Sequence, residues 1–312
     1  MKGLELSRAF YEAYGKPMLD EFKEIMPYLA AGMFGSGSEC LGYDDDISKD
    51  HDFEPGFCIF LPGEDVIDRR TAFLLERAYA KLPREFMGFK RSLMQPVGGA
   101  RHGIFRTDEF FNEKIGSPDG SLSLSGWLTV PQQALLEVTS GEIFFDNYGE
   151  VSKIREKLEF YPEDIFLKKL AGQLLIMAQS GQYNYKRCIG HGETAAAQLA
   201  AFEFVKSAMA VIFLLNQRYM PYYKWSFKAL RELKKFSELS ETLEYLISSG
   251  NGKNICEEKY ILIESISSDI TAELINRGIT KASCGDLEKH AYSVNDGIED
   301  SELRNMHILA AI

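Results

Sequence analysis

Hydrophobic residues recur at helical spacing over residues 4–30, with charged residues between them. This pattern predicts an amphipathic helix that is broken near Gly15–Lys16–Pro17. An apolar run at 30–34 then leads into Gly35–Ser38, which is typical of a strand that ends in a tight turn. Further strands are expected at 57–61, 102–106 and 142–146, and helices at 64–82, 107–115 and 131–140.

From about residue 151 the pattern changes to consecutive helical segments in which glycine is sparse. These segments are 151–159, 162–180, 192–219, 224–249 and 257–278. The last thirty residues are polar and weakly patterned, and they receive no assignment. We therefore predict an α+β fold with two domains, an α/β domain over residues 1–148 with a mixed sheet and flanking helices, and a helical domain over 149–312.

The composition is that of a globular protein, with 45% hydrophobic and 26% charged residues among 312. The net charge of −11 argues against a nonspecific binder of nucleic acid and against double-stranded nucleic acid as a substrate, because phosphate neutralisation needs excess Lys and Arg. It does not exclude a local basic pocket for a nucleotide.

Five scattered cysteines without a C-x-x-C pair favour a reducing compartment. The N-terminus lacks the apolar region of a signal peptide. The most apolar stretch, Ser207–Leu215, is shorter than the ~20 residues of a membrane span and is expected to be a buried helix. These features predict a soluble, cytoplasmic protein with no membrane partner.

One group of residues in the sequence has the residue types and spacing of a metal and phosphate site. Gly37-Ser38 is followed, after eleven residues, by Asp50-His51-Asp52. In a strand, Asp50 and Asp52 would project from the same side, and two neighbouring carboxylates repel unless a cation lies between them. Mg²⁺ suits such oxygen ligands and bridges substrate phosphates, and Mn²⁺ is the alternative. Gly37-Ser38 at the start of a helix would offer backbone N–H groups to those phosphates.

The Gly-Ser-x11-Asp-x-Asp pattern resembles the signature of the DNA polymerase β-like nucleotidyltransferase superfamily, which includes the aminoglycoside and minimal nucleotidyltransferases. More closely, the stretch 35–62 (GSGSECLGYDDDISKDHDFEPGFCIFLP) resembles the bacterial DUF4037 family. Further blocks that resemble this family lie at 127–151, 155–171, 187–193 and 213–225. The resemblance covers roughly residues 30–230 and implies a nucleotidyltransferase-type fold.

The superfamily resemblance implies that Gly37 and Ser38 bind nucleotide phosphates and that Asp50 and Asp52 bind magnesium. The superfamily often adds a third carboxylate on the next strand. The strand expected at 102–106 has none, and Asp108 comes slightly late. This departure puts polymerase-type two-metal chemistry in doubt.

A substitute base could come from the helical half, as in kanamycin nucleotidyltransferase-like enzymes. Glu193, at an expected helix start, is the candidate, and a first-turn glutamate favoured by the helix dipole is an equal alternative. Asp146 is interpreted as a turn residue rather than a site acid.

Several other polar residues have both a functional and a structural interpretation. Arg187 is assigned to the triphosphate, against an ordinary surface ion pair. Lys224 is assigned to nucleotide binding, with an equal structural alternative in an aromatic helix–helix corner that includes Tyr223 and Trp225. The structural interpretation is preferred for His51 and for Asp44–Asp46, which is expected to be a solvated loop that caps a turn.

Taken together, the chain is predicted to transfer a nucleoside monophosphate, AMP, from a magnesium-bound nucleoside triphosphate to a hydroxyl acceptor on a small molecule or a protein. Glu193 would deprotonate the acceptor. Two alternatives stay open: a catalytically degenerate nucleotide-binding protein, and an interaction protein of toxin–antitoxin type. The acceptor, the preferred base and the oligomeric state are not determined by the sequence.

Overall fold

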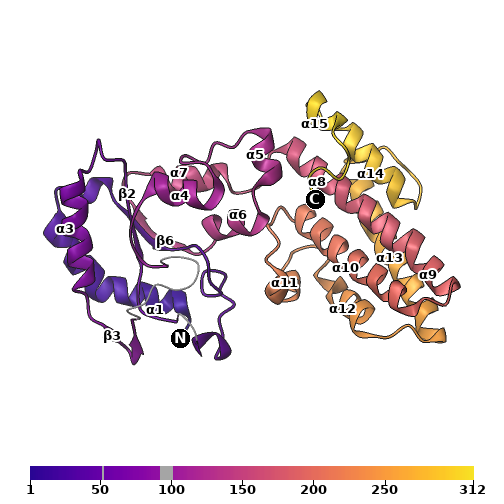
Figure 1. The fold of residues 1–312 in the computed structure, drawn as a ribbon, viewed down its shortest axis with the longest axis horizontal. Helices are drawn as coiled ribbons and strands as arrows, with labels where there is room; N and C mark the ends of the chain where they lie inside the picture. The colour runs from indigo at the N-terminus through magenta and orange to yellow at the C-terminus, as the bar shows by residue number, and fades with distance from the viewer. Residues whose placement is uncertain (51–52, 92–100) are drawn as a thin grey trace. The chain divides into compact units, whose positions relative to one another are not determined.

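The computed structural model describes residues 1–50, 53–91 and 101–312, without the side chains of residues 49 and 50 (Figure 1). Its contacts divide the chain into two compact units. Unit 1 comprises Met1–Leu122 and Val130–Glu159, and unit 2 comprises Ser123–Thr129 and Phe160–Ile312. The boundary expected after residue 148 precedes helix α7 (Glu150–Lys157), which lies in unit 1.

Unit 1 contains a four-stranded mixed sheet with the order β5-β2-β1-β6. Its strands are β1 (Ala30–Met33), β2 (Cys58–Leu61), β5 (Gly103–Arg106) and β6 (Glu142–Asp146). β1 is antiparallel to both β2 and β6, and β2 is parallel to β5. All residues of β1 and β2 are buried, which is why these central strands read as uninterrupted apolar runs. The mixed sheet with flanking helices is therefore confirmed, and its four strands lie where the sequence predicted them.

The helices of unit 1 cover this sheet, and a short hairpin lies beside it. The helices are α1 (Gly3–Phe10), α2 (Lys16–Leu19), α3 (Arg69–Ala80), α4 (Thr107–Ile115), α6 (Gln132–Thr139) and α7. The hairpin consists of β3 (Glu85–Phe86) and β4 (Phe89–Lys90). Shorter segments are a π-helix at Tyr11–Gly15 and 3₁₀ turns at Asp20–Phe22, Met26–Tyr28 and Ile47–Asp50.

Aromatic side chains join the π-helix that follows α1, and helix α3, to the sheet. Phe57, just before β2, is fully buried, and its ring lies 5.3 Å from that of Tyr11 and 5.1 Å from that of Tyr79. The Tyr79 hydroxyl donates to the Phe57 carbonyl at 2.7 Å and accepts from the Phe57 N–H at 3.1 Å. Gly15 leaves no room for a side chain beside the Phe57 ring. The first helix continues through the π-helical turn Tyr11–Gly15 into α2, so the break expected near Gly15–Lys16–Pro17 is absent. The contact between Gly15 and Phe57 ties the N-terminal segment to the start of β2.

Unit 2 is helical. Its helices are α5 (Leu124–Thr129), α8 (Glu163–Met177), α9 (Lys186–Gly190), α10 (Thr194–Leu215), α11 (Tyr223–Leu230), α12 (Ser240–Ser248), α13 (Lys253–Asn276), α14 (Leu287–Asp296) and α15 (Ser301–Asn305). A π-helix over Ala178–Tyr185 extends α8, and a 3₁₀ turn over Ser237–Leu239 precedes α12. Gly181 of the π-helix leaves no room for a side chain between Phe204 of α10 and Ile263 of α13, so the three helices pack closely there.

Helix α10 bears on the expectation that no stretch of the sequence is long enough to span a membrane. Among the helices that the structure describes, it alone is long and apolar enough to cross a membrane by length and composition. Helix α10 lies within the helix expected over 192–219, but its apolar character extends beyond the stretch Ser207–Leu215 that the sequence analysis singled out. Because 67% of its most apolar window is buried inside the structure, α10 behaves as a core helix of unit 2, as predicted for that stretch.

One prediction about the helices of unit 2 is wrong, and a region that received no assignment is helical. The single helix expected over 224–249 is interrupted between α11 and α12, where Phe236 adopts a left-handed conformation with φ of 65°. The Asn216 side chain holds this interruption by binding both the N–H and the carbonyl of Lys235. The C-terminal region, left unassigned, forms α14 and α15, and α14 packs along α8 (Figure 1).

Candidate functional site

The loop that carries Gly37 and Ser38, residues 34–42, follows directly from the central strand β1 and is called the Gly-Ser loop. Gly35 and Gly37 adopt φ values of 122° and 129°, which L side chains rarely adopt. The carbonyl of Ser38 accepts hydrogen bonds from the N–H groups of Leu41 and Tyr43. Ser38 thus opens a hydrogen-bonded turn and not the helix that the sequence analysis expected, because the left-handed Gly42 ends the turn. The Glu39 carboxylate lies against Gly37, where a side chain would collide with it.

The Asp-x-Asp motif lies only partly within the described residues. Asp50 ends the 3₁₀ turn Ile47–Asp50, so the prediction that Asp50 and Asp52 share the face of one strand is wrong for Asp50. The strand begins only at Cys58. The side chain of Asp50, and all of His51 and Asp52, lie outside the described residues.

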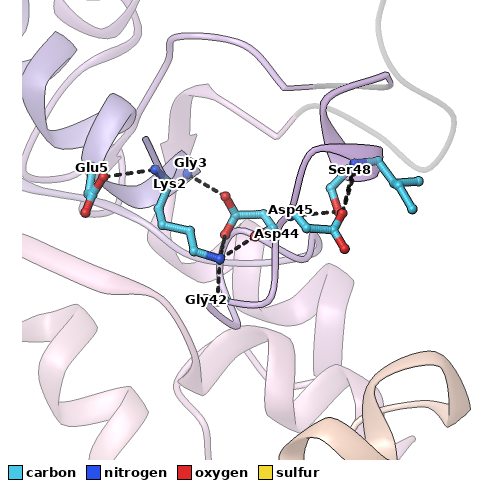
Figure 2. Close-up of polar contacts among 8 residues, drawn as sticks. Lys2, Gly3, Glu5, Gly42, Asp44, Asp45 and Ser48 are labelled. Carbon is cyan, nitrogen blue, oxygen red and sulfur yellow. Dashed lines mark hydrogen bonds and ion pairs between the residues drawn. The ribbon is translucent and has the colours of Figure 1, made fainter.

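The chain before the motif is anchored by the N-terminus (Figure 2). Asp44 is 2% exposed, and its carboxylate accepts the N–H of Gly3 at 2.9 Å and lies 3.7 Å from Lys2 Nζ. Lys2 Nζ also donates to the carbonyls of Gly42 and Asp44. The expectation of a solvated loop is therefore wrong for Asp44, because its carboxylate exchanges water for these partners.

Asp45 and Asp46 are exposed, as expected. Asp45 accepts the N–H groups of Ile47 and Ser48 at 3.1 and 3.0 Å, so it caps the 3₁₀ turn that leads to Asp50 (Figure 2). The predicted turn-capping role of this acidic run is thus confirmed for Asp45.

The chain after the motif returns to the same place. A Cβ atom added at Gly3 would lie 2.5 Å from Glu39 Cβ and 3.4 Å from the ring of Phe53. Phe53 follows Asp52 directly, and its ring also packs on Phe89 of β4 at 4.9 Å. Asp44 and Phe53, which flank the Asp-x-Asp motif in sequence, therefore both lie at Gly3, beside the Gly-Ser loop.

Two further acid–base pairs lie at this end of the sheet, where β1 ends and β2 and β5 begin. Arg101 Nη1 lies 3.8 Å from Glu39 Oε1, and His102 Nδ1 lies 3.4 Å from Glu54 Oε1. Desolvation by burial raises the pKa of Glu39, and the positive charge of Arg101 partly opposes this shift. The sequence analysis missed these four residues. The available signal was their position in the sequence. Glu39 follows β1, and the other three residues come just before β2 or β5, the two strands that begin at the end of the sheet where β1 ends.

The strand β5 carries no carboxylate, as the sequence indicated. Asp108 lies in the first turn of α4 and is exposed, with its carboxylate accepting the N–H of Glu109. Asp146 accepts the N–H groups of Gly149 and Ser152 at 2.8 and 2.7 Å, so it caps α7 as a turn residue. Within the described ranges, no group of three or more His, Cys, Asp or Glu side chains is arranged to hold a metal ion.

The other predicted site residues lie in unit 2, and each is exposed. Glu193 precedes α10 at the N-cap position without a side-chain capping hydrogen bond. Arg187 of α9 stacks over the ring of Tyr183 at 4.9 Å, and Lys224 Nζ lies 5.0 Å from the Trp225 ring. Their assigned roles stay predictions.

The aromatic corner that was expected around α11 is only half correct. Trp225 is buried, whereas Tyr223 is 86% exposed. Tyr223 is the first residue of α11, and its ring contacts the ring of Tyr222. At this position its side chain is exposed to solvent.

Comparison with known proteins gives a match to one family model and similarity to solved structures. Residues 127–226 match the family model DUF4037, a domain of unknown function. No curated protein matches the chain. A solved structure that is similar is the nucleotidyltransferase-like protein from Exiguobacterium sibiricum 255-15, with 10% identity and a TM-score of 0.41 over 96% of this chain and 87% of that chain. The resemblance to DUF4037 is therefore confirmed for residues 127–226, and the stretch 35–62 lies outside the segment that matches the family model.

Proposed function

We propose that the protein transfers a nucleoside monophosphate, AMP, from a magnesium-bound nucleoside triphosphate to a hydroxyl group of a small molecule or a protein. One observation supports this proposal above the others. Asp44 and Phe53, which flank Asp50 and Asp52 in sequence, both lie at Gly3, against which Glu39 of the Gly-Ser loop also packs. The described residues on either side of the Asp-x-Asp motif therefore lie beside the Gly-Ser loop, which supports the proposal that the two halves of the pattern share a site.

In this proposal Asp50 and Asp52 hold the metal ion. The donor set fits Mg²⁺, because carboxylate oxygens are its preferred protein ligands and both ends of the segment that carries them lie beside the Gly-Ser loop. When bound, Mg²⁺ neutralises charge on the phosphates during transfer. The backbone N–H groups at Gly37 and Ser38 would orient the phosphates, and the absence of a side chain at Gly37 allows a close approach.

The transfer forms a bond between the acceptor oxygen and the α-phosphorus and breaks the bond from that phosphorus to the bridging oxygen, so that pyrophosphate leaves. Glu193 is proposed to take the proton of the acceptor hydroxyl, and Arg187 and Lys224 to bind the triphosphate. All three side chains are exposed, as groups that meet a substrate must be.

Calorimetric titration with nonhydrolysable analogues of ATP, GTP, CTP and UTP, with and without magnesium, tests the proposal. We expect the wild type to bind at least the ATP analogue in a magnesium-dependent manner. The Asp50→Asn/Asp52→Asn variant should lose this binding by more than about tenfold, because each lost carboxylate removes a metal ligand. Its far-UV circular dichroism should not change. Binding that survives in this variant would contradict the assignment of the metal site.

A second candidate function is a nucleotide-binding protein without turnover. It is favoured by one observation, the absence of a carboxylate on β5. Magnesium-dependent binding of ATP, together with no release of pyrophosphate and no labelled product in the presence of a broad panel of hydroxyl compounds and proteins, would select it over the transferase.

A further inference from the structure

A cavity of about 580 Å³ lies within unit 2, between the π-helix Ala178–Tyr185 and the start of α14. This volume is within the range of sites for small organic molecules, about 300–1,000 Å³. The π-helix forms one wall, and such helices are rare and occur often at functional sites. The proposed function uses none of the residues that line this cavity.

Polar side chains with little or no exposure hold the walls of the cavity in place. The Gln182 side chain donates to the Gly285 carbonyl at 2.9 Å and accepts the N–H of Leu287 at 2.9 Å, so it joins the π-helix to the start of α14. His290 is fully buried, and its Nε2 lies 2.7 Å from the Cys284 carbonyl, which accepts its hydrogen bond. The cavity is therefore formed in advance by the fold, which lowers the entropy cost of binding.

The lining of the cavity is acidic and rich in hydrogen-bond acceptors. Asp286 and Glu288 line it together with the amides of Gln179 and Asn184, and no Lys or Arg is among the lining residues. Asp286 uses Oδ1 to cap α14 by accepting the N–H of Glu288. Within residues 1–50, 53–91 and 101–312, the side chains of Gln179, Asn184 and Glu288 form no hydrogen bond or ion pair with another residue. Their oxygens are thus available to a ligand that donates hydrogen bonds.

Tyr183 adds an aromatic group to the same lining. Its side chain is 58% exposed, and the guanidinium of Arg187, which does not line the cavity, lies 4.9 Å from the centre of its ring. The face of an aromatic ring attracts cations through its quadrupole, and this contact shows that the Tyr183 ring does so. The carboxylates and the ring therefore favour the same kind of ligand, one with a positive charge.

We infer that this cavity binds a small organic cation, an alkyl amine whose protonated nitrogens bind the carboxylates of Asp286 and Glu288. An anion would be repelled by these two charges, and a neutral polyol would leave them without a counter-ion. A metal ion does not fit, because no group of three or more His, Cys, Asp or Glu side chains in the described part of the chain is arranged to hold one. The inference is independent of the proposed function, since it concerns a separate set of residues.

Calorimetric titration of the full chain with spermidine tests the inference, with sorbitol as the neutral probe. Salt at about 0.15 M screens attraction to remote charges. The wild type should bind spermidine and not sorbitol. Asp286→Asn/Glu288→Gln should weaken the affinity for spermidine by about fivefold or more, because both charge pairs are lost while asparagine keeps the cap of α14. Tyr183→Leu should weaken it about two- to fivefold.

The matched control is Glu241→Gln/Glu257→Gln, which makes the same change in charge at two exposed carboxylates of unit 2 outside the cavity. Its affinity for spermidine should stay within about twofold of the wild type. An equal loss in the two double variants would show that spermidine is attracted only by the net charge of −11, and the inference would be wrong.

Gly285→Phe is a second variant that does not depend on the carboxylates. Gly285 lines the cavity, its φ is not left-handed, and a Cβ atom there would meet no atom within 4 Å, so the fold should accept the larger side chain. We expect this side chain to narrow the cavity and to weaken spermidine binding about tenfold. Spermidine should raise the melting temperature of the wild type but not that of Gly285→Phe. Wild-type protein that does not bind spermidine, or Gly285→Phe that binds it as the wild type does, would overturn the inference.

Discussion

Gly141 shows how one backbone position joins α6 to the sheet. Its φ is 72°, its N–H donates to the Cys40 carbonyl at 2.8 Å, and a side chain there would collide with the Met33 carbonyl of β1. We predict that Gly141→Ala lowers the free energy of unfolding by about 2–3 kcal/mol, because left-handed strain and a backbone collision add. Equilibrium denaturation by urea measures this change.

Gly149 is the matched control for this prediction. Its φ is 76°, but a side chain there would meet no atom within 4 Å. Gly149→Ala should therefore cost only about 1 kcal/mol, which is the strain without the collision. Equal losses in the two variants would show that the contact with β1 is not the cause.

Residue types also explain why some site residues were recognised in the sequence and others were not. Gly37, Ser38, Asp50 and Asp52 stand at a spacing that carries information by itself. Glu39 is an ordinary glutamate in sequence, and its importance comes from burial and from Arg101, which lies 62 positions later. No local pattern encodes such a pair, because the two residues come together only when β5 pairs with β2, next to β1 in the sheet.

At the scale of elements, the N-terminus of α1 holds the chain at Asp44, which leads into the Asp-x-Asp motif. Asp44→Ala would remove the acceptor for the Gly3 N–H and the carboxylate partner of Lys2. We predict a loss of about 1–3 kcal/mol in the free energy of unfolding, because a buried donor loses its partner. Amide hydrogen exchange of residues 44–48 should accelerate in this variant, since the loop loses its attachment.

Glu24→Ala is the control for the loop anchor, because Glu24 is an exposed carboxylate in the same unit. It should change stability by less than about 0.5 kcal/mol and leave the exchange of the loop as in the wild type. Unchanged exchange in Asp44→Ala would refute the anchoring role.

The elements themselves were predictable where one periodicity dominated. The four strands of the sheet and helix α4 lie where the apolar pattern placed them, because burial on both faces or on one stripe leaves a local signal. The interruption between α11 and α12 was not predictable, since it depends on the Asn216 side chain, which comes from the end of α10. Local propensity cannot report a partner that is about twenty residues away.

At the scale of the whole molecule, stability should depend on pH through buried lysines. Lys168 is fully buried, and its Nζ donates to Asn295 Oδ1 at 2.9 Å and to the Met306 carbonyl at 2.8 Å, both neutral partners. Burial lowers the pKa of Lys168 below its ordinary value of 10.5. Between the lowered pKa and 10.5, the unfolded chain binds more protons than the folded chain. The contribution of Lys168 to the free energy of unfolding therefore rises as the pH rises across that window.

Lys168→Met should remove this dependence. We predict that the difference in melting temperature between wild type and Lys168→Met shifts in favour of the wild type as pH rises toward about 10. The comparison cancels the opposite effect of tyrosines such as Tyr161, whose pKa burial raises. Circular dichroism melts at several pH values between neutral and 10 measure the effect, and parallel curves for the two proteins would exclude it.

The sequence by itself determined the fold class, the positions of the strands and the resemblance to DUF4037. These depend on local periodicity and on contiguous motifs, which a chain displays before it folds. Only the tertiary structure decided that Asp44 and Phe53 both lie at Gly3, that Asp44 is buried and that Glu39 lies 3.8 Å from Arg101. Each of these is a contact between segments about 40 to 60 residues apart, and its energy comes from desolvation and charge pairing that exist only once the sheet brings those segments together.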